Sequence, residues 1–321
     1  MNLKEYASYD GLGLAALVAQ KEVTPRELAQ TALAAINAVD DRVNAVVETY
    51  EDRTSGLDEA TLSDGPFKGV PFLIKDVGGQ EKGRKIEYGS RLCEGMIAEF
   101  DTNYYKLVIA AGLNVIGRTN TPEYSIAGSA ENLLYGNTST PWREGYSAGG
   151  SSGGAAAAVA AGMVPLAHGS DIGGSIRIPA AWCGGIGLKP SRGLISAGPV
   201  LDEGGFGLAV NFVQSKTMRD TAAILDCLGI PQTGDPFIIQ RPDQPFSEIL
   251  SNPPKKLRNA KSAAPLMDAP IDPEVAAATK YDAVMMEDMG NSDEEDPQPN
   301  DNKAPARAKA QNWLYCFDKR L

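Results

Sequence analysis

Two patterns in the sequence predict an α/β layered fold: segments with helical periodicity, and short apolar segments of strand length that alternate with them. Of the 321 residues, 43% are hydrophobic, which is enough to build one substantial core. No stretch approaches the roughly 20 apolar residues that a membrane-spanning helix needs, and the N-terminus has none of the regions of a secretory signal. We therefore expect a soluble, cytoplasmic protein without membrane contact.

The first predicted helix covers residues 24–39. Thr24 and Glu27 match a capping box, and Pro25 suits the first helical position. In two later helices, over residues 102–111 and from Thr217 onward, a threonine is the expected N-cap and a glycine the expected stop. The other predicted elements are strands at 70–74, 113–117, 164–167 and 185–188 and an alanine-rich helix at 155–161.

The periodicity weakens beyond about residue 230, where only one further helix is expected, opened by Asp272 and Pro273. The segment 291–310 has almost no apolar residue to bury, which predicts a solvated loop or linker. We divide the chain into a core and a partial C-terminal region of the same domain, at residues 1–230 and 231–321.

Charge and cysteine content exclude several classes of protein. The chain has 30 basic and 41 acidic residues, a net charge of −11, which argues against a nucleic-acid partner. The four cysteines contain no CxxC pair, so neither a metal site nor a disulfide framework is expected and free thiols are favoured. These cysteines are Cys93, Cys183, Cys227 and Cys316.

Two clusters of glycine and serine carry the candidate chemistry: residues 147–154 (SAGGSSGG) and 171–175 (DIGGS). Such clusters are often flexible linkers, but apolar segments adjoin both, so we expect their backbone to be fixed. In the second cluster, the amides of Ile172, Gly173 and Gly174 precede Ser175 and could hold a developing oxyanion. The alternative is a tight turn in which Ser175 only caps the following helix.

Three familiar glycine motifs do not fit the first cluster. Gly154 is followed by alanine, which excludes a Walker phosphate loop, and the spacing of a dinucleotide fingerprint is absent. Residues 149–153 match G-x-S-x-G around Ser151, but His168 is the only histidine and no acidic residue lies between them. A Ser-Asp-His order cannot be assembled, and His168 is expected to be a core residue.

A serine nucleophile then needs another base, and a lysine can serve if burial keeps its amine neutral. Lys75 ends an apolar strand and is one candidate, while Lys189 is a rival. The alternative for Lys75 is a head group that reaches water or pairs with Asp76. Asp171 and Arg177 flank the second cluster, and their ion pair would be a structural support.

Three segments together resemble the amidase signature family. They are Gly149–Pro190, which contains both clusters, Gly69–Asp76 (GVPFLIKD) and Gly117–Tyr124 (GRTNTPEY). The resemblance extends over roughly residues 10–230. It implies a mixed β-sheet core with helices on both faces, and it implies that the family fold is incomplete at the C-terminus of this chain.

The resemblance also implies roles for individual residues. Ser175 would be the nucleophile, Ser151 would bridge to it through a cis peptide bond, and Lys75 would be the base. The oxyanion hole would consist of main-chain amides at Ile172, Gly173 and Gly174. The implied reaction is hydrolysis of a small carboxamide, with esters as a side activity, through an acyl-enzyme and without a cofactor.

Within the family, residues 167–199 resemble bacterial amidases of the 6-aminohexanoate cyclic dimer hydrolase type. Two alternatives stay open. One is a glutaminase-type subunit of a tRNA-dependent amidotransferase, which would need a partner protein and tRNA. The other is an inactive, truncated family member. The sequence does not decide the oligomeric state, and a homodimer is compatible with it.

Overall fold

The computed structural model describes residues 1–252, 255–262 and 270–295. The chain divides into two compact units, Met1–Leu250 and Ser251–Leu321. The sequence-based division into residues 1–230 and 231–321 stays a prediction. In the described parts of the chain, no helix is both long and apolar enough to cross a bilayer.

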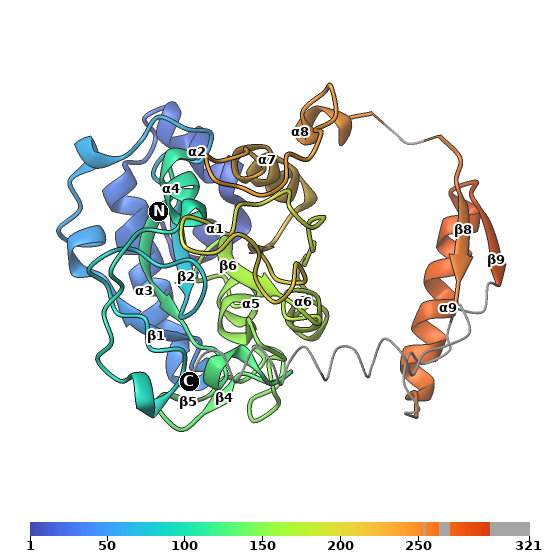
Figure 1. Ribbon diagram of the computed structural model, residues 1–321, viewed down its shortest axis with the longest axis horizontal. Helices are drawn as coiled ribbons and strands as arrows, with labels where there is room; N and C mark the ends of the chain where they lie inside the picture. Colours follow the sequence, from blue (N-terminus) through green and yellow to red (C-terminus); the bar gives the residue numbers. More distant parts are fainter. Residues whose placement is uncertain (253–254, 263–269, 296–321) are drawn as a thin grey trace. The chain divides into compact units, whose positions relative to one another are not determined.

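The first unit is built on a five-stranded mixed sheet with the order β1-β3-β2-β6-β7 (Figure 1). The three central strands run parallel. The two edge strands are antiparallel to their neighbours: β1 pairs with β3, and β7 pairs with β6. This arrangement confirms the predicted fold class. The strands are β1 (Val46–Thr49), β2 (Pro71–Lys75), β3 (Asn114–Thr119), β6 (Leu166–Asp171) and β7 (Val210–Ser215).

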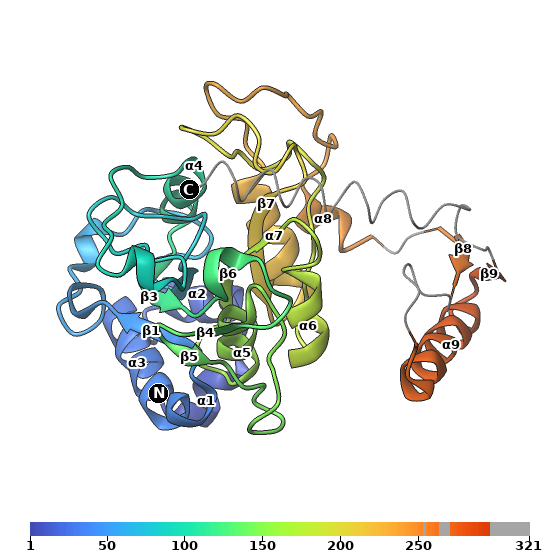
Figure 2. The same ribbon diagram turned by 60° about the horizontal axis from the view of Figure 1, so that its bottom comes forward.

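Helices cover both faces of this sheet. Figure 2 shows α4 and α7 on one side of the sheet and α3 and α5 on the other. Right-handed crossovers place α4 and α5 on opposite faces, since α4 connects β2 to β3 and α5 connects β3 back across β2 to β6. The helices are α3 (Pro25–Val43), α4 (Asn103–Ala110), α5 (Gly153–Ala160) and α7 (Met218–Leu228).

Helix starts follow the predicted capping chemistry. Thr24 and Glu27 form the complete capping box of α3. Thr102 accepts a hydrogen bond from the Tyr105 amide at the start of α4, and Thr217 caps α7 in the same way. The remaining elements of this unit are α1 (Leu3–Ser8), α2 (Gly11–Ala19), α6 (Arg177–Cys183), α8 (Phe246–Ile249), the short pair β4 (Glu131–Asn132) and β5 (Gly136–Asn137), and four 3₁₀ turns at Glu51–Arg53, Glu59–Thr61, Arg91–Cys93 and Glu123–Ser125.

The sheet register brings the two chemically important segments to the same end of the sheet. Phe72 of β2 lies opposite Leu166 of β6, and the two strands run parallel. Their carboxyl ends therefore lie side by side at the same end of the sheet, where parallel α/β sheets commonly have their binding and active sites. Lys75 ends β2 and Asp171 ends β6 at this end.

The expected strand at residues 185–188 is wrong. Only Ile186 bridges to Ser215 of β7, and the segment around it is irregular. Its short apolar run resembles a buried strand in sequence, but this segment is only partly covered. Cys93, Cys183 and Cys227 are free thiols as expected, and Cys316 lies outside the described residues.

The second unit contains the helix predicted at Asp272 and Pro273, which is α9 (Pro273–Asp288). Two parallel strands accompany it, β8 (Arg258–Lys261) and β9 (Ser292–Glu295). The prediction of a loop over 291–310 is therefore wrong for residues 292–295. The strand was missed because its residues are polar and show no apolar alternation. Residues 296–310 lie outside the described part of the chain.

Candidate active site

Lys75 is buried at the end of β2, with only 1% of its surface exposed. Its Nζ atom is hydrogen-bonded to Ser151 Oγ at 2.7 Å and to Ser170 Oγ at 2.9 Å. Burial lowers the pKa of Lys75 to about 7, although the negative charge of Asp171 acts in the opposite direction. A substantial fraction of this amine is therefore neutral near pH 7. The alternative in which the lysine head reaches water is wrong.

Asp76 does not pair with the neighbouring lysine. Its carboxylate accepts hydrogen bonds from Arg118 at 2.5 Å and from the amides of Glu87 and Gly89 at 2.8 and 3.0 Å. Arg118 is itself buried and also contacts Glu87 through its side chain. Because these donors satisfy Asp76, no carboxylate directly beside Lys75 in sequence stabilises a charged amine.

Ser151 is buried in the loop before α5 and follows a cis peptide bond with Gly150, as the family resemblance implies. Thr121, just after β3, also holds this loop, because its hydroxyl donates a hydrogen bond to the Ser151 carbonyl at 3.0 Å. The loop also passes close to other backbone. A Cβ atom at Gly150 would lie 2.6 Å from the Ser129 nitrogen. The cluster is a packed turn and not a flexible linker.

Ser175 lies at the start of the turn into α6 and is partly exposed. Ile176 is the N-cap of α6, and no side chain caps the helix, so the reading of Ser175 as a capping residue is wrong. The Ser175 carbonyl accepts from the Ser152 amide at 3.1 Å, which ties the two glycine-rich clusters together. Within the described residues the Ser175 hydroxyl forms no hydrogen bond, so contact with Ser151 is not made in this arrangement.

Asp171 organises the turn between β6 and α6. Its carboxylate accepts from the amides of Gly174 and Ile176 at 2.7 and 3.1 Å and from two nitrogens of Arg177. Burial alone would raise the pKa of Asp171, but these hydrogen bonds hold it below its usual value. The expected ion pair with Arg177 is therefore formed.

The contact with Asp171 bears on the predicted oxyanion donors. The Gly174 amide already donates to this carboxylate, so it is not directed at a substrate oxygen here. Ile172 and Gly173 lie in the partly exposed part of the same turn. The sequence could not separate the three amides, because the direction of each N–H depends on local φ and ψ.

His168 is a satisfied core residue, as expected. Its Nδ1 accepts from the Lys75 backbone N–H at 3.2 Å, which leaves the proton on Nε2 to be donated to Asn211 Oδ1 at 3.1 Å. Burial, with a smaller effect of the Lys75 charge, lowers the pKa of His168 to about 3. The neutral ring therefore fixes the backbone of Lys75 and does not contact either serine hydroxyl through these bonds.

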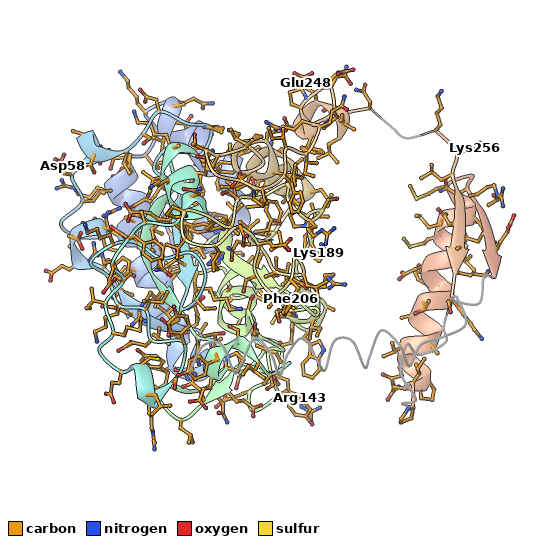
Figure 3. All side chains as sticks on the ribbon, in the orientation of Figure 1. Asp58, Arg143, Lys189, Phe206, Glu248 and Lys256 are labelled. Carbon is orange, nitrogen blue, oxygen red and sulfur yellow. The ribbon has the colours of Figure 1, made fainter. Side chains whose placement is uncertain are left out.

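Lys189, the rival base, is partly exposed and donates to the Pro190 carbonyl at 2.5 Å (labelled in Figure 3). It has no hydrogen bond to a serine within the described residues. Sequence reasoning missed Ser170, the second hydroxyl at the Lys75 amine. No local signal identified Ser170, because the predicted strand ended at residue 167 and the contact joins two strands that are distant in sequence.

The mixed sheet, together with a buried lysine beside two glycine-rich serine turns, defines the class of amidase signature proteins. The chain belongs to the amidase family, because the family described as "Amidase" matches residues 27–316. The resemblance inferred from the three sequence segments is thereby confirmed.

Named relatives agree with this assignment. The chain is 36% identical over 290 residues to the 6-aminohexanoate-cyclic-dimer hydrolase of Paenarthrobacter ureafaciens, with 88% of this chain and 58% of the relative covered. It is 38% identical over 285 residues to an acylamidase of Rhodococcus erythropolis, with 86% and 59% covered. The solved structure of 6-aminohexanoate cyclic dimer hydrolase complexed with substrate superposes with a TM-score of 0.85 and 35% identity, covering 90% of this chain and 61% of that one. The chain thus spans about three fifths of the length of these proteins.

Proposed function

We propose that this protein hydrolyses small carboxamides, with esters as a side activity, through an acyl-enzyme on Ser175. The observation that carries the proposal is the buried Lys75 amine at 2.7 Å from Ser151 Oγ, with a pKa lowered to about 7. A neutral amine in that position can accept a proton from a serine hydroxyl. The names of the two relatives, a cyclic-dimer hydrolase and an acylamidase, support amides as the substrate class.

In the proposed reaction, Ser175 Oγ attacks the substrate carbonyl while its proton passes to Ser151, whose own proton passes to Lys75. The tetrahedral oxyanion is stabilised by main-chain amides of the turn that leads to Ser175. The C–N bond then breaks, and the leaving amine receives the proton back along the same route. Water hydrolyses the ester on Ser175 by the same transfers and regenerates the hydroxyl.

The relay requires the Ser175 hydroxyl to turn toward Ser151. The backbone hydrogen bond from the Ser152 amide to the Ser175 carbonyl already fixes the two turns next to each other. Catalytic hydrogen bonds are often long without substrate and tighten in the complex. In the proposed reaction, the Ser175 hydroxyl reaches Ser151 when substrate is bound.

Labelling with a fluorophosphonate probe, followed by peptide mapping, tests the proposal. We expect a covalent adduct on Ser175 that Ser175→Ala abolishes. Lys75→Ala should slow labelling by about 10²- to 10⁴-fold, the usual contribution of a general base. Lys189→Ala is the matched control and should label at the wild-type rate. An adduct confined to Ser151, or no adduct on folded protein, would contradict the assignment.

A further inference from the structure

A glutamine on the neighbouring strand holds the backbone directly after Ser175. Gln214 belongs to β7 and is 1% exposed. Its Nε2 atom donates to the Ile176 carbonyl at 2.7 Å. A carbonyl oxygen can only accept a hydrogen bond, so it is the nitrogen of the Gln214 side-chain amide, and not its oxygen, that points toward Ile176. This contact connects the edge strand of the sheet to the turn that carries the nucleophile.

The same turn is also held at Ser175, whose carbonyl accepts from the Ser152 amide at 3.1 Å, and by two local contacts at Ile176. The Ile176 amide donates to Asp171 at 3.1 Å, and the Ile176 carbonyl also accepts from the Ala180 amide at 3.2 Å. Asp171 ends β6, which pairs with β7, and Ala180 lies in α6, so both contacts act through the backbone that leads into or out of the turn. Gln214 is distant in sequence and adds a direct hydrogen bond from β7 to the Ile176 carbonyl. Without Gln214 the carbonyl would keep one partner, so the turn would stay folded but less restrained.

The side-chain oxygen of Gln214 gives a reason to regard the contact with Ile176 as the role of this residue. Its Oε1 atom is buried and, within the described residues, has no hydrogen-bond partner. Burying an unpaired oxygen is unfavourable, and a leucine or methionine would fill the same space without that cost. Packing alone would therefore favour an apolar residue at this position of β7.

We propose that Gln214 is a positioning residue, which sets the orientation of Ser175 toward the carbonyl under attack by restraining Ile176. This inference rests on the proposed function, in which Ser175 is the nucleophile. Small displacements of a reacting group can cost large factors in rate. We expect Gln214→Leu to slow fluorophosphonate labelling of Ser175, and to lower kcat on a small carboxamide, by about tenfold, while KM changes little.

Asn114 provides a matched control. It is also completely buried, its Nδ2 also donates to a backbone carbonyl, that of Arg53 at 2.8 Å, and its Oδ1 is also unpartnered among the described residues. It is the first residue of β3 and lies opposite Pro71, the first residue of β2, so it is at the other end of the strands from Lys75. Asn114→Leu should change the melting temperature of the 321-residue chain in the same way as Gln214→Leu but leave the labelling rate at the wild-type value.

The test is therefore a comparison of three labelling rates, with the melting temperature of each protein as a check of folding. Gln214→Met is the second variant if the leucine does not fold, and it should show the same loss. Equal labelling of the Gln214 and Asn114 variants would overturn the positioning role alone. A wild-type chain that is folded but not labelled would instead overturn the proposed function, and the positioning role with it.

Discussion

The protonation state of a single buried amine decides whether the proposed chemistry can run. Burial depresses the pKa of Lys75 to about 7, and only the neutral form accepts a proton. The labelling rate of Ser175 should therefore rise from about pH 5 to about pH 9, with a half-maximum near pH 7. Measuring that rate across the range is the check. A rate independent of pH, or a half-maximum near the usual value for lysine, would contradict Lys75 as the base.

Ser170 gives a second prediction at the residue scale. Its hydroxyl is hydrogen-bonded to the Lys75 amine at 2.9 Å and so helps to direct the amine toward Ser151. Ser170→Ala should slow labelling by about three- to tenfold, as expected for the loss of one hydrogen bond of about 1 kcal/mol. Ser170→Thr retains the hydroxyl and should stay within about twofold of wild type on the same scale. Equal rates for both variants would exclude this role.

The residues of the site differ in how far the sequence reveals them. Lys75 and Ser151 could be predicted because they lie in segments with a recognisable pattern, and the structure brings their side chains together. Ser170 and Gln214 could not, since each acts through a contact with a segment that is distant in sequence. The direction of the Gly174 amide depends on one local backbone turn, which composition does not specify.

At the scale of elements, the glycine at position 154, in the first turn of α5, is required by close packing. A Cβ atom at Gly154 would lie 2.5 Å from the Asn120 nitrogen and 2.6 Å from the Ala45 carbonyl oxygen. Helix propensity alone would make Gly154→Ala stabilising, but backbone cannot move aside cheaply. We expect Gly154→Ala to destabilise the protein by about 1 to 3 kcal/mol in chemical unfolding.

Gly128→Ala is the control for this prediction. No atom lies within 4 Å of a Cβ built there, so its stability should stay within about 0.5 kcal/mol of wild type. Similar stability of the two variants would show that the first turn of α5 adjusts to a methyl group, and that close packing does not explain the glycine at 154.

Elements with local signals were predictable, and those that depend on distant partners were not. The capping box of Thr24 and Glu27 specifies where α3 begins without reference to the rest of the chain. The strand at residues 292–295 has no such signal, because its polar residues become a strand only by pairing with β8. At residues 185–188 the apolar run suggested a strand, but only a single bridge forms.

At the scale of the whole molecule, the strand order creates the site. The sequence indicates alternating helices and strands but not that β6 inserts beside β2, since that order follows from tertiary packing. The pairing of β2 with β6 places Lys75 next to the turn at Asp171. Prediction of the site from sequence therefore rested on the family resemblance, because local patterns do not show that Lys75 and the two serine-containing turns lie next to each other.

A buried amine should also make the fold as a whole less stable than it could be. In the unfolded chain Lys75 has its ordinary pKa of about 10.4, whereas in the folded protein it is lowered to about 7. Between these values the unfolded state binds the proton that the native state lacks, so stability rises with pH across this window. Below about pH 7 both states are protonated, and the full cost of burying the charge remains.

Lys75→Met removes this cost while keeping a similar side-chain volume. The variant leaves Ser151 and Ser170 without their amine partner, which offsets part of the gain. We expect a net stabilisation of about 1 to 3 kcal/mol at pH 6, measured by urea unfolding, that shrinks as pH rises toward about 10. The same variant should lose labelling of Ser175. A variant that is less stable than wild type at pH 6 would mean that the hydrogen bonds of the amine outweigh its desolvation, and that the site does not strain the fold.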